Sequence, residues 1–317
     1  MERISIVLCS DDAFAQHGAV AMLSVVQSAR DPSKIDFYYI DGGLSEISKE
    51  KIRKTLADFA GNLYFLEANL SQFRDAYISH YYSVATYYRL LLPQILPKEV
   101  TRCLYMDCDM VVDGDVEELW NTDLFGAPIG AVLDLGVVLS PRRITRKEKV
   151  LGNLGGRYFN AGLLLIDLNA WRRTQYAKQA IDLAISHKYE SHDQDALNAV
   201  FAGQWHRLSY RWNKMPAVWG FHMKLLMHCF AYKEAIQARF QKGITHYASR
   251  HKPWECREIS FFNQKYYDVL RKTPFAEGFQ PRRSRINESH SNIGELIRIL
   301  LGAFFYRVAV VFTGNAR

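Results

Sequence analysis

The first 70 residues alternate between short apolar runs and amphipathic runs, and this alternation is the strongest constraint on the fold. The apolar runs have the length and composition of buried strands and lie at residues 4–10, 35–40 and 62–67. Between them, residues 17–30 and 45–59 repeat their apolar side chains at helical spacing. Strands that alternate with helices form a mostly parallel sheet with helices on both faces. We therefore expect an α/β fold.

The rest of the chain continues this alternation. We expect further helices at residues 81–92, 115–120, 170–187 and 192–201. Further strands are expected within 103–112, on each side of Asp107 and Asp109, and at 129–134, 163–167 and 205–210. Pro93 and Pro97 are expected to stop the helix that precedes the fourth strand. Residues 142–149 are rich in arginine and lysine and predict a solvated basic loop, with a flexible lid or an acceptor contact as the alternative.

Acidic residues follow several of the predicted strands. Asp107 and Asp109 interrupt an apolar run, and residues at i and i+2 of an extended chain point to the same side. Asp11 and Asp134 also follow strands, and ligands of open α/β sheets bind at the carboxyl ends of strands. In one interpretation, Asp107 and Asp109 simply end a strand in a turn and have no further role. Because an unpaired buried carboxylate is costly, a metal or an ionic partner is the other interpretation.

A histidine and a lysine near residue 250 complete a candidate metal and phosphate site. Asp107, Asp109 and His246 are the ligand types that suit Mg²⁺ or Mn²⁺, and Lys252 is a natural partner for a phosphate. The sequence has no GxxxxGK[ST] motif, and no GxGxxG follows the first strand. This excludes the commonest ATPase and dinucleotide sites. A sugar-nucleotide pyrophosphorylase would need a glycine-rich loop where Asp11 and Asp12 stand.

Charge and cysteine content narrow the function classes. The chain has 317 residues and a formal net charge of +7, of which +5 lies from Arg271 onwards, so that the body is nearly neutral. A nucleic-acid binder would spread its basic residues over the folded body, and we expect no nucleic-acid partner. The five cysteines form no CxxC pair, which predicts a reducing compartment. The first apolar run is too short for a signal peptide, so a cytoplasmic protein is expected.

The last 44 residues differ from the rest of the chain. We expect a catalytic domain at 1–273 and a basic, apolar tail at 274–317 that associates with the anionic inner face of the membrane. Residues 293–312 are strongly apolar but contain Glu295, Arg298 and Arg307. An interfacial helix keeps these charges in the headgroup region and is favoured. Packing on the body or on a partner subunit, and a true membrane span, are the alternatives.

Six short motifs together carry a family resemblance. The chain resembles glycosyltransferase family 8, in the branch of bacterial lipooligosaccharide galactosyltransferases and lipopolysaccharide glucosyltransferases, across about residues 4–256. The motifs occur in the family's order and at similar spacing, at Leu8–Asp12, Tyr87–Leu90, Leu104–Asp109, Tyr158–Gly162, His192–Asp195 and His246–Trp254. The resemblance implies a GT-A-type, Rossmann-like fold. It also implies a retaining, Mn²⁺-dependent transfer of galactose or glucose from UDP-galactose or UDP-glucose to a cell-surface glycan or glycolipid, with Mg²⁺ as an alternative ion.

The same resemblance assigns roles position by position. The metal ligands would be Asp107, Asp109 and His246, and the residues beside the anomeric carbon would be Asp193 and Gln194. The donor would contact Asp11, Arg89, Asp107, Cys108, Asp134, Asn160, Ala161, Ser249 and Lys252. The alternation of the strand turns the side chain of Cys108 into the core, and Arg89 can instead be a structural ion-pair partner. Ala13, Phe14 and Ser249 depart from the usual residues of the family.

The reaction can follow one of two routes. An amide such as Gln194 is a poor nucleophile, so we expect front-face attack by the acceptor hydroxyl, with the departing phosphate as the base. Asp193 is the alternative nucleophile. Two other functions remain open, a glycoprotein-directed transferase of the same family and a sugar-nucleotide-binding scaffold without turnover.

Overall fold

The computed structural model describes residues 3–69, 73, 84–219, 231–248, 252–255 and 261–279. Ser249 and residues 280–317, which include the apolar segment of the predicted tail, lie outside the described residues.

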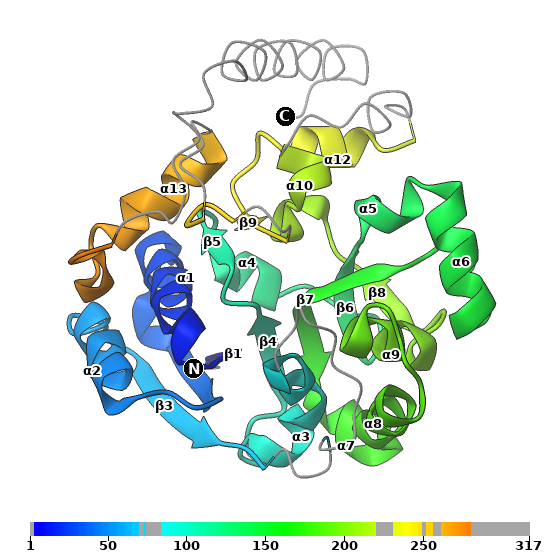
Figure 1. Ribbon diagram of the computed structural model, residues 1–317, viewed down its shortest axis with the longest axis horizontal. Helices are drawn as coiled ribbons and strands as arrows, with labels where there is room; N and C mark the ends of the chain where they lie inside the picture. The colour runs from blue at the N-terminus through cyan, green and yellow to red at the C-terminus, as the bar shows by residue number, and fades with distance from the viewer. Residues whose placement is uncertain are drawn as a thin grey trace.

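A seven-stranded sheet forms the centre of the molecule, in the order β3-β2-β1-β4-β7-β6-β8 (Figure 1). β7 is antiparallel to both of its neighbours, and the other pairings are parallel, so the sheet is mostly parallel as expected. Its strands are β1 Ile4–Ser10, β2 Ile35–Asp41, β3 Asn62–Glu67, β4 Arg102–Met106, β6 Ile129–Leu133, β7 Phe159–Asp167 and β8 Trp205–Arg207.

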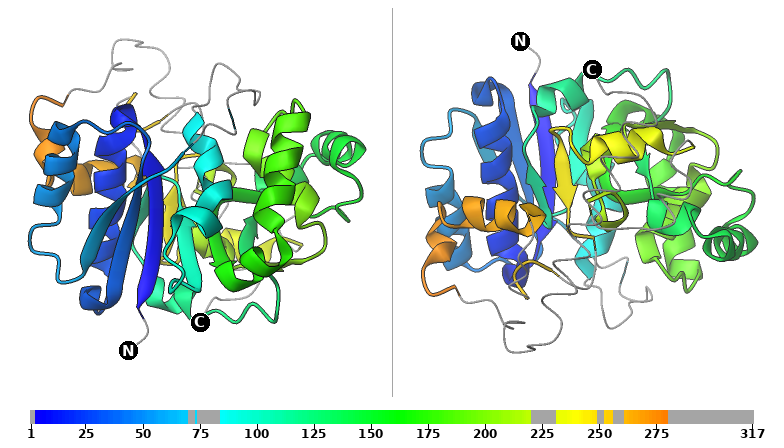
Figure 2. Two further views of the ribbon diagram at one scale, coloured as in Figure 1. Left: turned by 90° about the horizontal axis from the view of Figure 1, so that it is seen from below. Right: turned by 90° about the horizontal axis from the view of Figure 1, so that it is seen from above.

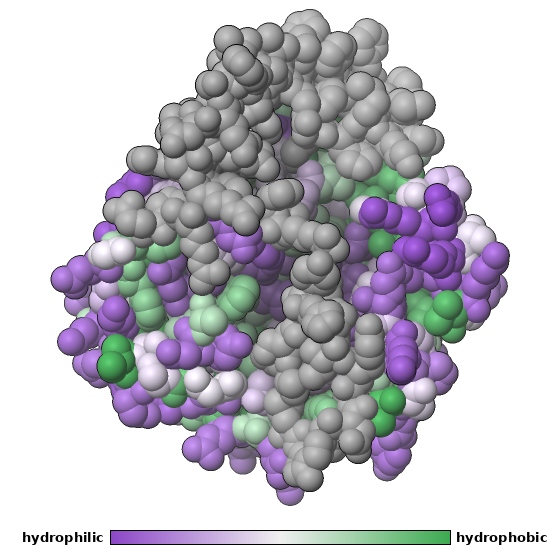
Figure 3. All heavy atoms as spheres, viewed as in Figure 1, coloured by the Kyte–Doolittle hydropathy of each residue, from purple (hydrophilic) through white to green (hydrophobic). Residues whose placement is uncertain are grey.

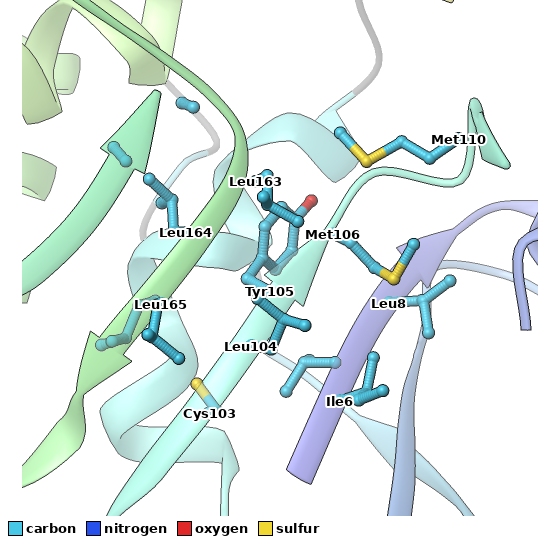
Figure 4. Close-up of a cluster of buried hydrophobic side chains, with 14 of the residues drawn as sticks. Ile6, Leu8, Cys103, Leu104, Tyr105, Met106, Met110, Leu163, Leu164 and Leu165 are labelled. Atoms are coloured by element: carbon cyan, nitrogen blue, oxygen red, sulfur yellow. The ribbon is translucent and has the colours of Figure 1, made fainter. Parts of the chain in front are cut away.

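A second, two-stranded sheet lies beside the end of β4. It pairs β5 (Met110–Val112) with β9 (Ile244–His246) in antiparallel register. The strands expected on each side of Asp107 and Asp109 are therefore both present, and they belong to different sheets, because the chain leaves the large sheet after Met106 and enters the small one at Met110. Figure 4 shows this departure between the labelled Met106 and Met110.

Helices cover both halves of the large sheet. Helices α1 and α2 contact each other near β1 to β3, while α8 and α9 pack together beside β7 (Figures 1 and 2). The α-helices are α1 Ala15–Ser28, α2 Glu46–Thr55, α3 Leu92–Ile95, α4 Val116–Trp120, α5 Leu135–Val138, α6 Pro141–Leu151, α7 Leu168–Thr174, α8 Tyr176–Ser186, α9 His192–Val200, α10 Pro216–Trp219, α12 Lys233–Ala238 and α13 Phe261–Leu270. The 3₁₀ helices are η1 Asp12–Phe14, η2 Pro32–Lys34, η4 Val84–Leu91, η5 Tyr210–Asn213 and η6 Pro274–Ala276.

Three expected elements differ from those observed. In the described part of the helix expected at 81–92, residues 84–91 form the 3₁₀ helix η4. Pro93 lies in the first turn of the following α3, which begins at Leu92, because the first turn of a helix tolerates proline. The helix expected at 170–187 is broken into α7 and α8 at Gln175, which has a left-handed φ of 55°. The strand expected at 205–210 ends at Arg207.

The basic segment at 142–149 is helical, not a loop. It belongs to α6, which begins with Pro141 at a position that favours proline. Its helical nature escaped the sequence pattern because the buried position on this helix is Lys147, not an apolar residue. The other basic residues of α6 are exposed, and they contribute to the hydrophilic surface at the right of Figure 3.

A continuous apolar core holds the end of β4 in place. Ile6 and Leu8 of β1, Leu104 of β4 and Leu164 of β7 are fully buried and belong to the side-chain cluster in Figure 4. Each such side chain contributes roughly 1.5–3 kcal/mol by leaving water. The loop that follows Met106 is thereby attached to the buried core.

The beginning of the predicted tail packs on the body. Phe275 lies under the ammonium group of Lys51, 5.2 Å from its ring centre, and Phe279 contacts the ring of Tyr267. Throughout the ranges that the structure describes, no helix combines the length and the apolar character needed to cross a membrane.

Candidate active site

Three side chains that are far apart in the sequence meet at the carboxyl end of β4. Asp107 and Asp109 lie in the loop from β4 to β5, and His246 is the last residue of β9. The pairing of β5 with β9 places His246 opposite Met110, next to Asp109. One ligand atom from each of the three residues lies within 4.8 Å of the other two. The sequence predicted this group from the ligand types and from the family resemblance, and the structure brings the three side chains together in space.

Lys252 and His246 surround the carboxylate of Asp109. The Nζ atom of Lys252 lies 2.5 Å from one oxygen of Asp109, and Nε2 of His246 lies 3.1 Å from the other. Burial alone would raise the pKa of Asp109, but Lys252 and His246 outweigh it and hold this pKa well below its usual range. Lys252 also donates to the carbonyl oxygen of Tyr247 at 2.7 Å. A negatively charged group bound beside Asp109 would therefore be within reach of Lys252.

Arg89 connects the first of these acids to Asp193. Its guanidinium is 2.9 Å from Asp107 and 2.9 Å from Asp193, and the residue is only 6% exposed. Thr86 donates to the other oxygen of Asp193 at 2.5 Å. Burial alone would lower the pKa of Arg89, but the two carboxylates outweigh it and raise this pKa above its usual value. Arg89 therefore holds two predicted site acids together as a buried ion pair.

An irregularity in β7 presents backbone groups to the same place. The register of β7 against β6 shifts beside residues 161–163, and bulges of this kind redirect groups near functional sites. The carbonyl of Gly162 accepts a hydrogen bond from the backbone N–H of Asp107 at 2.8 Å. The carbonyl of Ala161 accepts one from Arg89. The beginning of β7 is thus fixed to both the acid loop and Arg89.

All the hydrogen-bonding positions of the Gln194 amide are filled. Its oxygen accepts from the backbone N–H of Ala161 at 3.0 Å and from the amide of Asn160 at 3.1 Å. Its nitrogen donates to the hydroxyl of Tyr158 at 3.1 Å and to Asp134 at 3.3 Å. Burial raises the pKa of Asp134 above its usual value. Gln194 is therefore held in one orientation, and its oxygen is a still weaker nucleophile than a free amide.

Other residues predicted to bind the donor have structural contacts. Asp11 caps η1 through the N–H of Phe14 at 3.3 Å, and Asp134 caps α5 through the N–H of Val137 at 3.3 Å. The role of Asp11 and Asp134 in binding the donor therefore stays a prediction.

Cys108 lies between the two acids of the loop but faces the other way. Its side chain is buried and donates to the carbonyl of Cys9 at 3.2 Å. The expected inward orientation is therefore present, and a contact between Cys108 and the donor would have to come from its backbone.

A buried ion pair that the sequence did not reveal supports Gln194. The ammonium group of Lys147 lies 2.8 Å from both oxygens of Asp195, and Tyr158 donates to Asp195 at 2.6 Å. Tyr158 in turn accepts from Gln194. The sequence pattern placed Lys147 on a solvated basic segment and gave no role in the site to Asp195 beyond the motif His192–Asp195. Asp195 lies in the first turn of α9, and its negative charge is compensated by Lys147 of α6.

The residues present fit a divalent metal. Two carboxylates and an imidazole with converging ligand atoms suit Mn²⁺ or Mg²⁺ and leave further coordination positions for a substrate. The fit also depends on Gly162. A Cβ atom there would lie 2.5 Å from Cε1 of His246 and 2.7 Å from Oδ2 of Asp107. Only glycine therefore leaves space for these two side chains to converge.

Replacing Gly162 with alanine is expected to weaken Mn²⁺ binding by roughly 10–100-fold, the effect of disturbing the residues that orient a metal ligand. The new methyl group would push His246 and Asp107 apart. Titration calorimetry with Mn²⁺ measures the change. Gly130→Ala is the control. Gly130 lies in β6, and its new Cβ would lie 2.7 Å from the side chain of Leu124, away from Asp107, Asp109 and His246. Equal Mn²⁺ affinity of Gly162→Ala and the wild type would contradict this metal site.

Comparison with known proteins identifies the family. The general stress protein A of Bacillus subtilis is 28% identical to this chain, covering 86% of the chain and 94% of that protein. The lipopolysaccharide 1,2-glucosyltransferase of Escherichia coli is 25% identical, covering 87% and 80%. The crystal structure of the galactosyltransferase LgtC in complex with donor and acceptor sugar analogs is 28% identical, with a TM-score of 0.72, and covers 86% of this chain and 96% of that one. The fold is the GT-A type of these neighbours. The model of glycosyl transferase family 8 matches residues 5–257, and this chain belongs to that family.

Proposed function

We propose that this chain is a retaining hexosyltransferase that transfers galactose or glucose from a UDP-sugar to a lipooligosaccharide- or lipopolysaccharide-type acceptor. The observation that carries the proposal is the convergence of Asp107, Asp109 and His246 next to the Arg89–Asp193 ion pair and the fixed amide of Gln194. The similarity to LgtC with bound donor and acceptor analogs, and to a lipopolysaccharide glucosyltransferase, supports the same assignment.

We assign separate groups of residues to the metal ion, the diphosphate and the rest of the donor. Asp107, Asp109 and His246 would hold Mn²⁺, or Mg²⁺, which when bound stabilises the negative charge of the diphosphate leaving group. Lys252 would contact the β-phosphate, because its ammonium group lies beside Asp109. The donor contacts of Asp11, Cys108, Asn160, Ala161 and Ser249 are part of the proposal.

The geometry favours attack from the front face. One oxygen of Asp193 accepts a hydrogen bond from Thr86 and the other is ion-paired with Arg89, while the oxygen of Gln194 accepts two hydrogen bonds. Attack on the sugar by Gln194 would break both hydrogen bonds of its oxygen, and attack by Asp193 would break its ion pair with Arg89. The acceptor hydroxyl would attack the anomeric carbon while its bond to UDP breaks, and the hydroxyl proton would pass to the departing phosphate. A covalent adduct trapped on Asp193 would overturn this route.

The remaining parts of the proposal concern location and acceptor. We propose that the protein is cytoplasmic and binds the anionic inner face of the membrane through residues 274–317, most of which lie outside the described residues. The acceptor would then be a lipid-linked glycan. A glycoprotein acceptor and a scaffold without turnover remain the alternatives.

Removing divalent metal should stop release of UDP from UDP-galactose or UDP-glucose. We expect EDTA to lower the hydrolysis rate at least roughly 100-fold, because the charge on the leaving group loses its main stabilisation. Added Mn²⁺ should restore the rate. Phosphate release from UDP by a coupled assay gives the measurement, and UDP-N-acetylglucosamine serves as the donor control. A rate that EDTA leaves unchanged would contradict metal dependence, and donor binding without turnover would favour the scaffold.

A further inference from the structure

The side chain of Asn213 lies between the proposed metal ligand His246 and the side-chain amide of Asn160. It is fully buried at the end of η5. Its nitrogen donates to the side-chain oxygen of Asn160 at 2.9 Å, and its oxygen lies 2.9 Å from Nδ1 of His246. No feature of the sequence singles out Asn213. Its position in the structure makes it the direct link between His246 and Asn160.

The backbone fixes the direction of these hydrogen bonds. The N–H of Gly162 can only donate, and it points at the side-chain oxygen of Asn160 at 3.0 Å. That atom is therefore the acceptor, so Asn213 must turn its NH₂ group toward it. The oxygen of Asn213 then faces His246 and requires a proton on Nδ1. In the neutral imidazole, the form that binds a metal ion, this leaves the lone pair of His246 on Nε2, the atom that faces Asp109.

A second backbone N–H fixes the orientation of Gln194. The N–H of Ala161 identifies the oxygen of Gln194, and the NH₂ of Asn160 donates to that oxygen as well. A single directed chain of hydrogen bonds therefore runs from His246 through Asn213 and Asn160 to Gln194. Reversing Asn160 or Gln194 would set its NH₂ group against a backbone N–H, and reversing Asn213 would set its oxygen against the oxygen of Asn160.

We propose that Asn213 is a positioning residue with two separable effects. Its oxygen sets the tautomer of His246 so that Nε2 is available to the metal, as partners of metal-bound histidines do. Its NH₂ group fixes Asn160, and through it Gln194, in the orientation that the donor sugar meets. The proposal rests on the proposed transferase function, because it assigns a role toward that metal and that donor.

Two substitutions at Asn213 separate these effects. Asn213→Leu keeps the number and branching of the side-chain heavy atoms and removes both hydrogen bonds, so Mn²⁺ binding is expected to weaken roughly 10–100-fold. Asn213→Asp keeps an acceptor for His246 and removes the donor for Asn160. Its Mn²⁺ affinity should stay within about threefold of the wild type, while its affinity for UDP-galactose or UDP-glucose at saturating Mn²⁺ falls by about tenfold or more. Asn160 cannot relieve the clash by flipping, because Gly162 holds its oxygen.

Titration calorimetry with Mn²⁺ alone, and then with the UDP-sugar at saturating Mn²⁺, gives both affinities. Circular dichroism and thermal unfolding check the fold of each variant. Asn263→Leu is the matched control, since it removes a buried amide on α13 outside this chain of hydrogen bonds, and its Mn²⁺ affinity should equal that of the wild type.

The possible outcomes separate this proposal from the proposed function. If the wild type binds neither Mn²⁺ nor a UDP-sugar, the proposed function is wrong. If the wild type binds both and Asn213→Leu is folded with unchanged Mn²⁺ affinity, the positioning role is wrong. If Asn213→Leu does not fold, Asn213→Asp decides, because an equal loss of metal and donor affinity would show a merely structural residue.

Discussion

Replacing Asp109 with asparagine is expected to lower kcat/KM for sugar transfer by at least roughly 1,000-fold, which corresponds to about 4 kcal/mol of transition-state stabilisation. Asp109 is the acid whose pKa is held well below its usual range, by Lys252 and His246 against the effect of burial, so its carboxylate is ionised at neutral pH. Asparagine keeps the size of the side chain but removes the charge. The loss should appear at saturating Mn²⁺ as well as at low Mn²⁺.

Steady-state assays of Asp109→Asn over a range of Mn²⁺ concentrations provide the measurement. Asp123→Asn is a suitable control, because Asp123 is exposed and caps a turn through the N–H of Phe125. It also removes one negative charge, and its activity should remain within about twofold of the wild type, as for most surface substitutions. Activity of Asp109→Asn within tenfold of the wild type would show that the carboxylate pair does not hold the metal.

Replacing Lys147 with methionine is expected to lower the free energy of unfolding by about 3–5 kcal/mol, the usual cost of leaving one partner of a buried ion pair uncompensated. Lys147 is 6% exposed, and Asp195, its partner, is 2% exposed. Asp195 also accepts from Tyr158, which contacts Gln194. The folded fraction of this variant should therefore have a lower kcat with a smaller change in KM for the donor.

Lys149→Met provides the comparison, because Lys149 is exposed on the same helix two residues further on. Its free energy of unfolding should change by no more than about 0.5 kcal/mol. Urea unfolding followed by circular dichroism measures both variants. Equal midpoints for the two substitutions would mean that the Lys147–Asp195 pair does not stabilise the fold.

Most of the α/β architecture could be predicted from the alternation of apolar runs, because buried strands and amphipathic helices have distinct periods. The predictions were wrong where tertiary contacts replaced the apolar pattern. α6 was taken for a loop because its buried position is Lys147, whose burial depends on Asp195 some 48 positions away. The strands before Asp107 and after Asp109 were predicted, but their membership of two different sheets was not, because both have the same apolar composition.

The candidate site was predictable to the extent that parallel strands end on one edge of a sheet. This principle and the family resemblance placed Asp107, Asp109, Asp193 and His246 together before any coordinates. The supporting residues were not predictable. Nothing in the sequence distinguishes Asn213, Lys147 or Thr86 from the residues around it, and the importance of each follows only from the atoms that it contacts.

The sequence by itself determined the kinds of groups available: paired carboxylates after an apolar strand, a histidine followed by a lysine, and an amide beside Asp193. The tertiary structure decided which of these groups meet and which tautomer of His246 fits its neighbours. His246 reaches Asp109 because β9 pairs with β5 across more than 130 residues, and its tautomer follows from an N–H of Gly162 that can only donate. Hydrogen-bond direction is a property of three-dimensional contacts, since each amide can present either end until a neighbour of fixed polarity selects one.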